Sequence, residues 1–274
     1  MADLRDALDA LSSRLGSRAN QLIASLETSG GNIVRSKENL AKVAQIMGDL
    51  RSSLIDDQFI EAVAEFVSDL DSIGVDVADS LAEFGDLPPD LLDDIITQFK
   101  LNAATDLLDP ATYATGVLSP IANSIIIGIA TSAALSATMQ SVTDAAGGLG
   151  AAADPIATGV PATLQRALTV AGADELGLDF FRYQGRPIAT TRDFCRDKEG
   201  HVWHRKEIEQ WGKDAAAGDG WAGMVPGTNA DTIFVHLGGY YGNRQVCRHS
   251  LVPLAKFDVP EEDLARMRSK GLID

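Results

Sequence analysis

The sequence predicts an α+β protein in which a mainly helical N-terminal region of amphipathic helices precedes a small α+β module. Three observations predict this division. Apolar residues recur every three or four positions through the first hundred residues, as on amphipathic helices. A stretch rich in glycine and alanine follows near residue 150. Beyond about residue 176 the apolar segments become aromatic and β-branched, as in short strands.

Composition and charge indicate a globular chain and restrict its partners. The 274 residues are 45% apolar and 23% charged, which excludes collagen-like and wholly disordered proteins. The net charge of −16 argues against general coating of nucleic acid, because the mean field repels phosphate. Two cysteines make no disulfide framework, and the acidic start lacks the order of a secretory signal, so we expect synthesis in the cytoplasm.

The charges and the reactive side chains are unevenly distributed along the chain. Residues 1–100 sum to −11, residues 101–180 to −6 with a single base, and residues 181–274 to +1. All four histidines, both cysteines and all three tryptophans lie between residues 195 and 249. Any site chemistry is therefore expected in the last third of the chain.

Three narrow apolar stripes predict helices before residue 75. The first runs from Leu4 to Leu26 and is expected to end at Gly30 and Gly31. The other two consist of Leu40, Val43, Met47, Leu50 and Leu54, and of Ile60, Val63, Phe66 or Val67, Leu70 and Ile73, with an end near Gly74. Because no stripe exceeds about four heptads, a plain bundle core and an oligomerising coiled coil both fit, the latter implying homo-oligomers through these helices.

A proline break and an uncharged segment follow. Pro88 and Pro89 start another helix, whose apolar face holds Leu91, Leu92, Ile95, Ile96 and Phe99. Residues 110–143 carry no charge, and about 20 apolar residues suffice to span a bilayer. Several polar residues interrupt this segment, so two interpretations stay open: a buried or subunit-facing helix, or a segment in transient contact with a membrane.

The remaining boundaries follow from composition. Residues 147–155 resemble a hinge, and a short helix is expected at 162–171, which gives an acidic helical region at 1–150 and a linker with a short helix at 151–175. The module at 176–257 is predicted to hold strands at 180–183, 233–236 and 251–254 and a helix at 205–211. Acids after Pro260 predict a helix in the tail, 258–274.

The order of motifs in this module resembles a known family. The motifs are Thr190-Thr191-Arg192-Asp193-Phe194-Cys195-Arg196, then Gly200-His201-Val202-Trp203, Glu207-Ile208, Trp211, Gly238-Gly239-Tyr240 and Cys247-Arg248-His249. Over about 75 residues they resemble the C-terminal module of phage Mu F-like head-morphogenesis proteins. The family places Asn directly before Cys-Arg-His, whereas here Asn243 stands four residues before Cys247. The resemblance implies a minor structural protein of a virion, near the portal or inside the head.

The cysteines and histidines are candidate zinc ligands. In an extended strand Cys247 and His249 share one face, and Cys195 with His201 or His204 would supply the other ligands of a tetrahedral set. Structural zinc is thus the cofactor these residues suit. No Cys-x2-Cys pair is present, so buried unliganded thiols and a Cys195–Cys247 disulfide stay open as alternatives.

A local excess of bases is a candidate contact surface. It comprises Arg182, Arg186, Arg192, Arg196, Lys198, Arg205 and Lys206, with Arg248 further along the chain. Such residues meet packaged DNA or an acidic protein surface, and the alternative is a solvated face with internal ion pairs.

Together these features favour a structural virion protein that contacts the portal or the major capsid protein and catalyses no reaction. The alternatives are an ejected, membrane-active virion protein that uses residues 110–143, and an enzyme that uses a cysteine with a histidine. Phosphate-binding glycine loops, His-Glu-x-x-His and Gly-x-Ser-x-Gly do not occur in the sequence.

Overall fold

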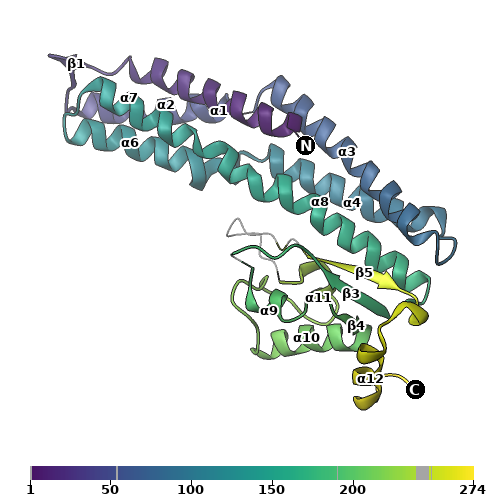
Figure 1. Ribbon diagram of the computed structural model, residues 1–274. Coiled ribbons are helices and arrows are strands. Elements are labelled where there is room, and N and C mark those ends of the chain that lie inside the picture. Colours follow the sequence, from purple (N-terminus) through teal and green to yellow (C-terminus); the bar gives the residue numbers. More distant parts are fainter. Residues whose placement is uncertain (1, 54, 190, 239–246, 248) are drawn as a thin grey trace. The chain divides into compact units, whose positions relative to one another are not determined.

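The computed structural model shows an α+β protein dominated by helices, as predicted (Figure 1). It describes residues 2–53, 55–189, 191–238, 247 and 249–274. The chain divides into two compact units, one made of Met1–Asp69 with Leu101–Ala157 and the other of Leu70–Lys100 with Thr158–Asp274. Each unit therefore combines two separate stretches of sequence, whereas the predicted boundaries mark consecutive segments.

The first unit is a set of helices with one small hairpin. Its elements are α1 (Ala2–Ile23), β1 (Thr28–Ser29), β2 (Asn32–Ile33), α2 (Lys37–Ser52), the first part of α3 (Asp57–Leu81), the end of α4 (Pro89–Leu108), α5 (Pro110–Tyr113), the π-helical turn η1 (Ala114–Leu118), α6 (Ser119–Ala130), α7 (Leu135–Ala146) and the start of α8 (Gly148–Glu175). Helix α1 packs along α7, and α6 packs on both α7 and α2.

The predicted stripes are largely buried, with a shift of one position in each of them. Along α1 the first stripe is buried from Leu4 to Ala19, and Ile23 is then buried in place of the half-buried Leu22; Leu26, in the turn after the helix, is buried again. Helix α2 buries Ile46 and leaves Leu40 46% exposed, and α3 buries Phe59 and leaves Ile60 43% exposed. The shift arises because adjacent apolar residues satisfy the same helical spacing, and packing decides which one faces inward.

Two glycines act differently from the prediction. Gly30 and Gly31 both have positive φ and form the two-residue turn between β1 and β2 rather than a helix end, because a turn of this kind needs left-handed residues. Helix α3 does not stop near Gly74 but continues to Leu81. A Cβ at Gly74 would collide with Ile96, so this glycine lets α3 and α4 approach each other.

The uncharged segment forms several helices instead of one. Ile121, Ile125 and Ile129 of α6 are fully buried, while Ile127 is 61% exposed. Gly128 lies against Thr138 of α7, where a Cβ would clash, so small residues allow the close packing. In the described part of the chain no helix is both long and apolar enough to cross a membrane.

Residues 148–155 are helical, whereas their composition predicted a hinge. Gly147 is the turn residue after α7, and residues 148–155 lie within the 28-residue helix α8, which also contains the short helix predicted at 162–171. Alanine explains the difference, since it has the highest helix propensity of all residues and the run is rich in it.

The C-terminal module contains a three-stranded antiparallel sheet in the order β4-β3-β5 (Figure 1). Its elements are β3 (Phe180–Gln184), α9 (Asp193–Arg196), β4 (Val202–His204), α10 (Arg205–Ala217), α11 (Ile233–His236) and β5 (Ser250–Leu254), followed by η2 (Lys256–Asp258) and the terminal helix α12 (Glu261–Ser269). The strands predicted at 180–183 and 251–254, the helix at 205–211 and the terminal helix are confirmed.

The strand predicted at 233–236 is wrong, because this segment is the helix α11. The Asn229 side chain accepts hydrogen bonds from the backbone N–H groups of Asp231 and Thr232, at 2.9 and 3.1 Å. Such a turn directs the chain into a helix and overrides the β propensity of the apolar residues that follow.

The two faces of the sheet pack against different clusters. Phe181 and Tyr183 of β3 point into an aromatic cluster with Phe234 of α11 and Ile208 of α10, and Ala173 of α8 belongs to the same cluster. Phe180 points to the opposite face, where Leu264 and Met267 of α12 complete a smaller cluster. The alternation of strand side chains therefore places Tyr183 beside both cysteines.

Candidate metal centre

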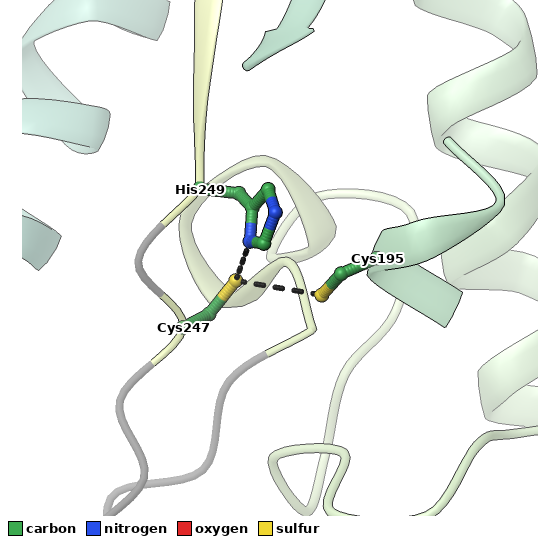
Figure 2. A group of neighbouring side chains, drawn as sticks. All are labelled: Cys195, Cys247 and His249. Atoms are coloured by element: carbon green, nitrogen blue, oxygen red, sulfur yellow. Dashed lines mark hydrogen bonds between the residues drawn. The ribbon is translucent and has the colours of Figure 1, made fainter. Parts of the chain in front are cut away.

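Three of the predicted ligands converge in the C-terminal module. Cys195 lies on α9, and Cys247 and His249 lie just before β5 (Figure 2). The sulfur atoms of Cys195 and Cys247 are 3.7 Å apart, and the Cys247 sulfur lies 3.7 Å from Nδ1 of His249. All three ligand atoms are within 4.8 Å of one another and the three residues are buried.

Local backbone features bring these side chains together. Cys247 and His249 face each other, with the Cys247 sulfur next to Nδ1 of the imidazole. Two glycines make room: a Cβ at Gly238 would collide with the Cys195 sulfur, and a Cβ at Gly185 would collide with the His249 ring. Leu237, directly before Gly238, has a φ of 45°, an uncommon conformation for a leucine.

Hydrogen bonds within the cluster shift the pKa values of the two thiols in opposite directions. The bond from Cys195 lowers the pKa of the Cys247 thiol, and the bond to His249 and the positive charge of Arg166 lower this pKa further against the opposing effect of burial. The bond to Cys247 and burial raise the pKa of the Cys195 thiol.

The histidine also carries a shifted pKa. Burial lowers the pKa of His249, but its hydrogen bonds to Cys247 and Glu199 outweigh burial, so this pKa is raised overall. Nε2 of His249 lies 3.4 Å from Oε2 of Glu199, on the side of the ring away from the cysteines. The Tyr183 hydroxyl donates to the Cys195 sulfur at 3.2 Å, and burial raises the pKa of this phenol.

Arg166 of α8 is the residue that sequence reasoning missed. Its guanidinium is buried and donates to the backbone carbonyls of Cys247, His249 and Val235, the last two at 3.0 and 3.1 Å. Arg166 therefore fixes the segment that carries two of the ligands. One feature of the sequence did set this residue apart: Arg166 is the single base among residues 101–180.

The other two predicted ligands lie elsewhere. His204 is the N-cap of α10: its Nδ1 accepts the backbone N–H of Lys206 at 3.2 Å, and its ring packs edge-on against Phe180. His201 is 56% exposed, and its Nδ1 lies 3.7 Å from Asp263. The turn after α9 directs these histidines away from Cys195, so the predicted ligand set is reduced to Cys195, Cys247 and His249.

The predicted basic residues are distributed over several environments. Arg205 pairs with Asp174 and Asp179 and lies over the Phe181 ring. The Lys198 ammonium lies 4.0 Å from the centre of the Phe194 ring, and its pKa is lowered by burial. Arg192 is the N-cap residue of α9 and Arg182 lies on β3, both half-buried, while Arg186, Arg196 and Lys206 are exposed. Arg248 and Asn243 lie outside the described residues.

The donor set suits a soft or borderline metal ion such as zinc. Both cysteines are free thiols, and their sulfur separation far exceeds the length of about 2.05 Å of a disulfide bond. A cysteine beside a histidine is also the pair that a thiol enzyme uses. Here, however, each member of the pair is less than 5% exposed. The chain matches no protein-family model, no curated protein and no solved structure.

Proposed function

We propose that this chain is a structural minor protein of a tailed-phage virion, whose C-terminal module is held together by zinc at Cys195, Cys247 and His249. The observation that carries the proposal is the convergence of the ligands. The segments around Cys195 and around Cys247 and His249, which carry the resemblance to Mu F-like proteins, are 52 residues apart in sequence and meet at one buried cluster.

The distances in the cluster suit zinc. Two Zn–S bonds of about 2.3 Å at the tetrahedral angle place the sulfur atoms about 3.8 Å apart. The observed separation is 3.7 Å. Three protein ligands leave one of the four positions of tetrahedral zinc for water or a further ligand.

The surroundings of the cluster suit a bound cation as well. Two thiolates would neutralise Zn²⁺, and burial of all three ligands would keep the ion from exchanging readily with solvent. Zinc would supply a cross-link between α9 and the segment before β5. Such a link stabilises a small module whose sheet has three short strands.

The helical region supports a role in contacts with other virion proteins. Helix α3 carries seven acidic residues and no base, and most of these acids are exposed. We assign contacts with the portal, the major capsid protein or further copies of the chain to such outer faces, since the apolar stripes are buried inside the unit. The proposed role requires no catalysis.

Analysis of purified virions tests the structural role. Mass spectrometry of wild-type particles is expected to find this polypeptide at a fixed low ratio to the portal protein. A double variant, Cys195→Ser with Cys247→Ser, is expected to give absent or malformed particles. Particles that lack the polypeptide would overturn the proposal, and normal double-variant particles that fail only after delivery would favour an ejected or catalytic protein.

Metal analysis tests the zinc assignment separately. Elemental analysis of the purified full-length chain is expected to give one zinc ion per chain, and Cys247→Ser is expected to lose it. His201→Ala is the matched control, because this exposed histidine lies outside the cluster and its loss should leave the zinc in place. Zinc-free wild-type protein, isolated without chelators, would contradict the assignment.

A further inference from the structure

We infer that Glu199 is a positioning residue for the metal site, because it holds His249 in the orientation and tautomer that present Nδ1 to the metal. This inference rests on the proposed zinc site and adds a residue that is not itself a ligand. It also specifies which ring nitrogen of His249 binds.

The two ring nitrogens of His249 face different partners. Nδ1 lies 3.7 Å from the Cys247 sulfur, whereas Nε2 lies 3.4 Å from Oε2 of Glu199. A carboxylate accepts a hydrogen bond and cannot donate one, so its position next to Nε2 favours the tautomer with the proton on Nε2. In that tautomer the free lone pair is on Nδ1 and points toward the two cysteines.

The ring has little freedom to turn over. His249 is 4% exposed, and its ring lies against the Tyr183 ring at a centroid distance of 5.2 Å. Gly185 also lies against the imidazole, so closely that a Cβ at this position would collide with Cδ2 and Cγ of the ring. The packing therefore limits the tilt of the imidazole, and the carboxylate selects which nitrogen carries the proton.

Glu199 is placed for this role by the same turn that positions a ligand. Its backbone N–H donates to the carbonyl of Cys195 at 3.1 Å, in the turn that follows α9. The Glu199 side chain is 20% exposed, so it reaches the buried ring from the edge of the module. One short segment thus provides a sulfur ligand and the carboxylate that orients the nitrogen ligand, an arrangement typical of protein zinc sites.

Zinc affinity of full-length variants tests this inference. The measurement is competition for Zn²⁺ with a chromophoric chelator, on wild type, Glu199→Ala, Glu199→Gln and the control Glu209→Gln. Glu209 lies on α10, outside the cluster, and its replacement removes the same charge. Loss of an outer carboxylate typically weakens metal binding about 10–100-fold. We expect this loss for Glu199→Ala, a smaller loss for Glu199→Gln, which keeps an acceptor oxygen, and no change for Glu209→Gln.

A second readout separates positioning from general stability. Long-range ¹H–¹⁵N correlation spectra of the zinc-loaded wild type are expected to show Nδ1 bound to metal and Nε2 protonated. The zinc-free melting temperatures of wild type and Glu199→Gln should agree, since the residue acts through the metal site.

The outcomes distinguish this inference from the proposed function. If the wild type binds no zinc, the zinc assignment and this inference fail together, while the structural role in the virion is decided by the analysis of particles. If the wild type binds zinc but Glu199→Ala binds it within about twofold of wild type, or if Nε2 is the bound nitrogen, only the positioning role is overturned. Should Glu199→Ala fail to fold, Glu199→Gln decides: several-fold weaker zinc binding supports the role, and unchanged binding overturns it.

Discussion

The first unit and the C-terminal module are stabilised in different ways. In the first unit, repeated rows of aliphatic side chains pack helix on helix, and α1 alone buries Leu4, Leu8, Leu11 and Leu15. In the C-terminal module, single polar groups each make several long-range contacts, as Arg166 does with the segment before β5. A core of many equivalent contacts tolerates loss of one contact better than a core that depends on a few.

This difference explains why the candidate metal ligands lie in the C-terminal module and not in the first unit. Aliphatic rows present no ligands, whereas the module gathers two thiols, one imidazole and a buried guanidinium in one place. Two optical probes can follow the regions separately. All three tryptophans lie between residues 203 and 221, so their fluorescence reports the module, and far-UV circular dichroism reports mainly the helices.

The largest effect is expected for Arg166→Ala. The substitution leaves three backbone carbonyls without their buried donor, which costs about 3 kcal/mol or more. Urea unfolding followed by tryptophan fluorescence should show the loss. The exposed Arg18 on α1 provides the control, and Arg18→Ala should stay within about 0.5 kcal/mol of wild type. An unchanged fluorescence midpoint in Arg166→Ala would contradict the comparison.

Asn39→Ala tests whether the first unit also contains a polar contact of this kind. The buried Asn39 amide accepts from the backbone N–H of Glu27 at 2.8 Å and donates to the carbonyls of Glu27 and Val34. Loss of these bonds should cost about 2 kcal/mol, measured by circular dichroism during urea unfolding. Asn102→Ala, an exposed change on α4, should have little effect. Equal midpoints for the two variants would show that the hairpin contributes nothing to stability.

Acid is expected to weaken the contact between α10 and α12. Burial raises the pKa of Glu207, but hydrogen bonds from Lys270, Arg266 and the backbone N–H of His204 outweigh burial and lower this pKa below the ordinary value of 4.5. A depressed carboxyl pKa means that the stabilisation is present above about pH 4.5 and is lost as the pH falls through the folded-state pKa. The fluorescence midpoint should therefore fall in acid, and Glu207→Gln should reduce this dependence. A variant with the full wild-type pH dependence would exclude Glu207 as its source.

The smallest effect is expected for Tyr183→Phe. The change keeps the ring in the aromatic cluster and removes the hydroxyl that donates to the Cys195 sulfur at 3.2 Å. The expected loss is about 1 kcal/mol in the tryptophan-monitored transition, with no change in the helical signal. A loss as large as that of Arg166→Ala would mean that the hydroxyl does more than donate one bond.

Sequence patterns predicted most of the elements and failed where packing, helix propensity or a local turn decided the outcome. The stripe of α1 was unambiguous, whereas Leu40 and Ile60 occupy positions that periodicity alone assigns equally well to the core. Residues 147–155 and 233–236 were assigned to the wrong structure. In the first case alanine propensity prevailed over the glycines, and in the second the Asn229 turn prevailed over β-branched residues.

The site was predictable in its ligand types and only partly in its members. The sequence reasoning grouped Cys247 with His249, and the two side chains are in contact. The sequence does not show in which direction the turn after α9 leads, so His201 and His204 were grouped with Cys195 although they lie elsewhere. Glu199 and Arg166 are not ligands themselves and act through the residues that are. Glu199 contacts His249, 50 positions away, and Arg166 contacts Cys247 and His249, 81 and 83 positions away, so sequence patterns could not reveal these roles.

Zinc K-edge X-ray absorption of the purified full-length chain tests the central claim most directly. The account predicts a first shell with two sulfur atoms at about 2.3 Å and nitrogen or oxygen atoms at about 2.0–2.1 Å. It also predicts that Cys247→Ser abolishes this signal. A shell of nitrogen and oxygen atoms alone, or a chain without zinc, would contradict it.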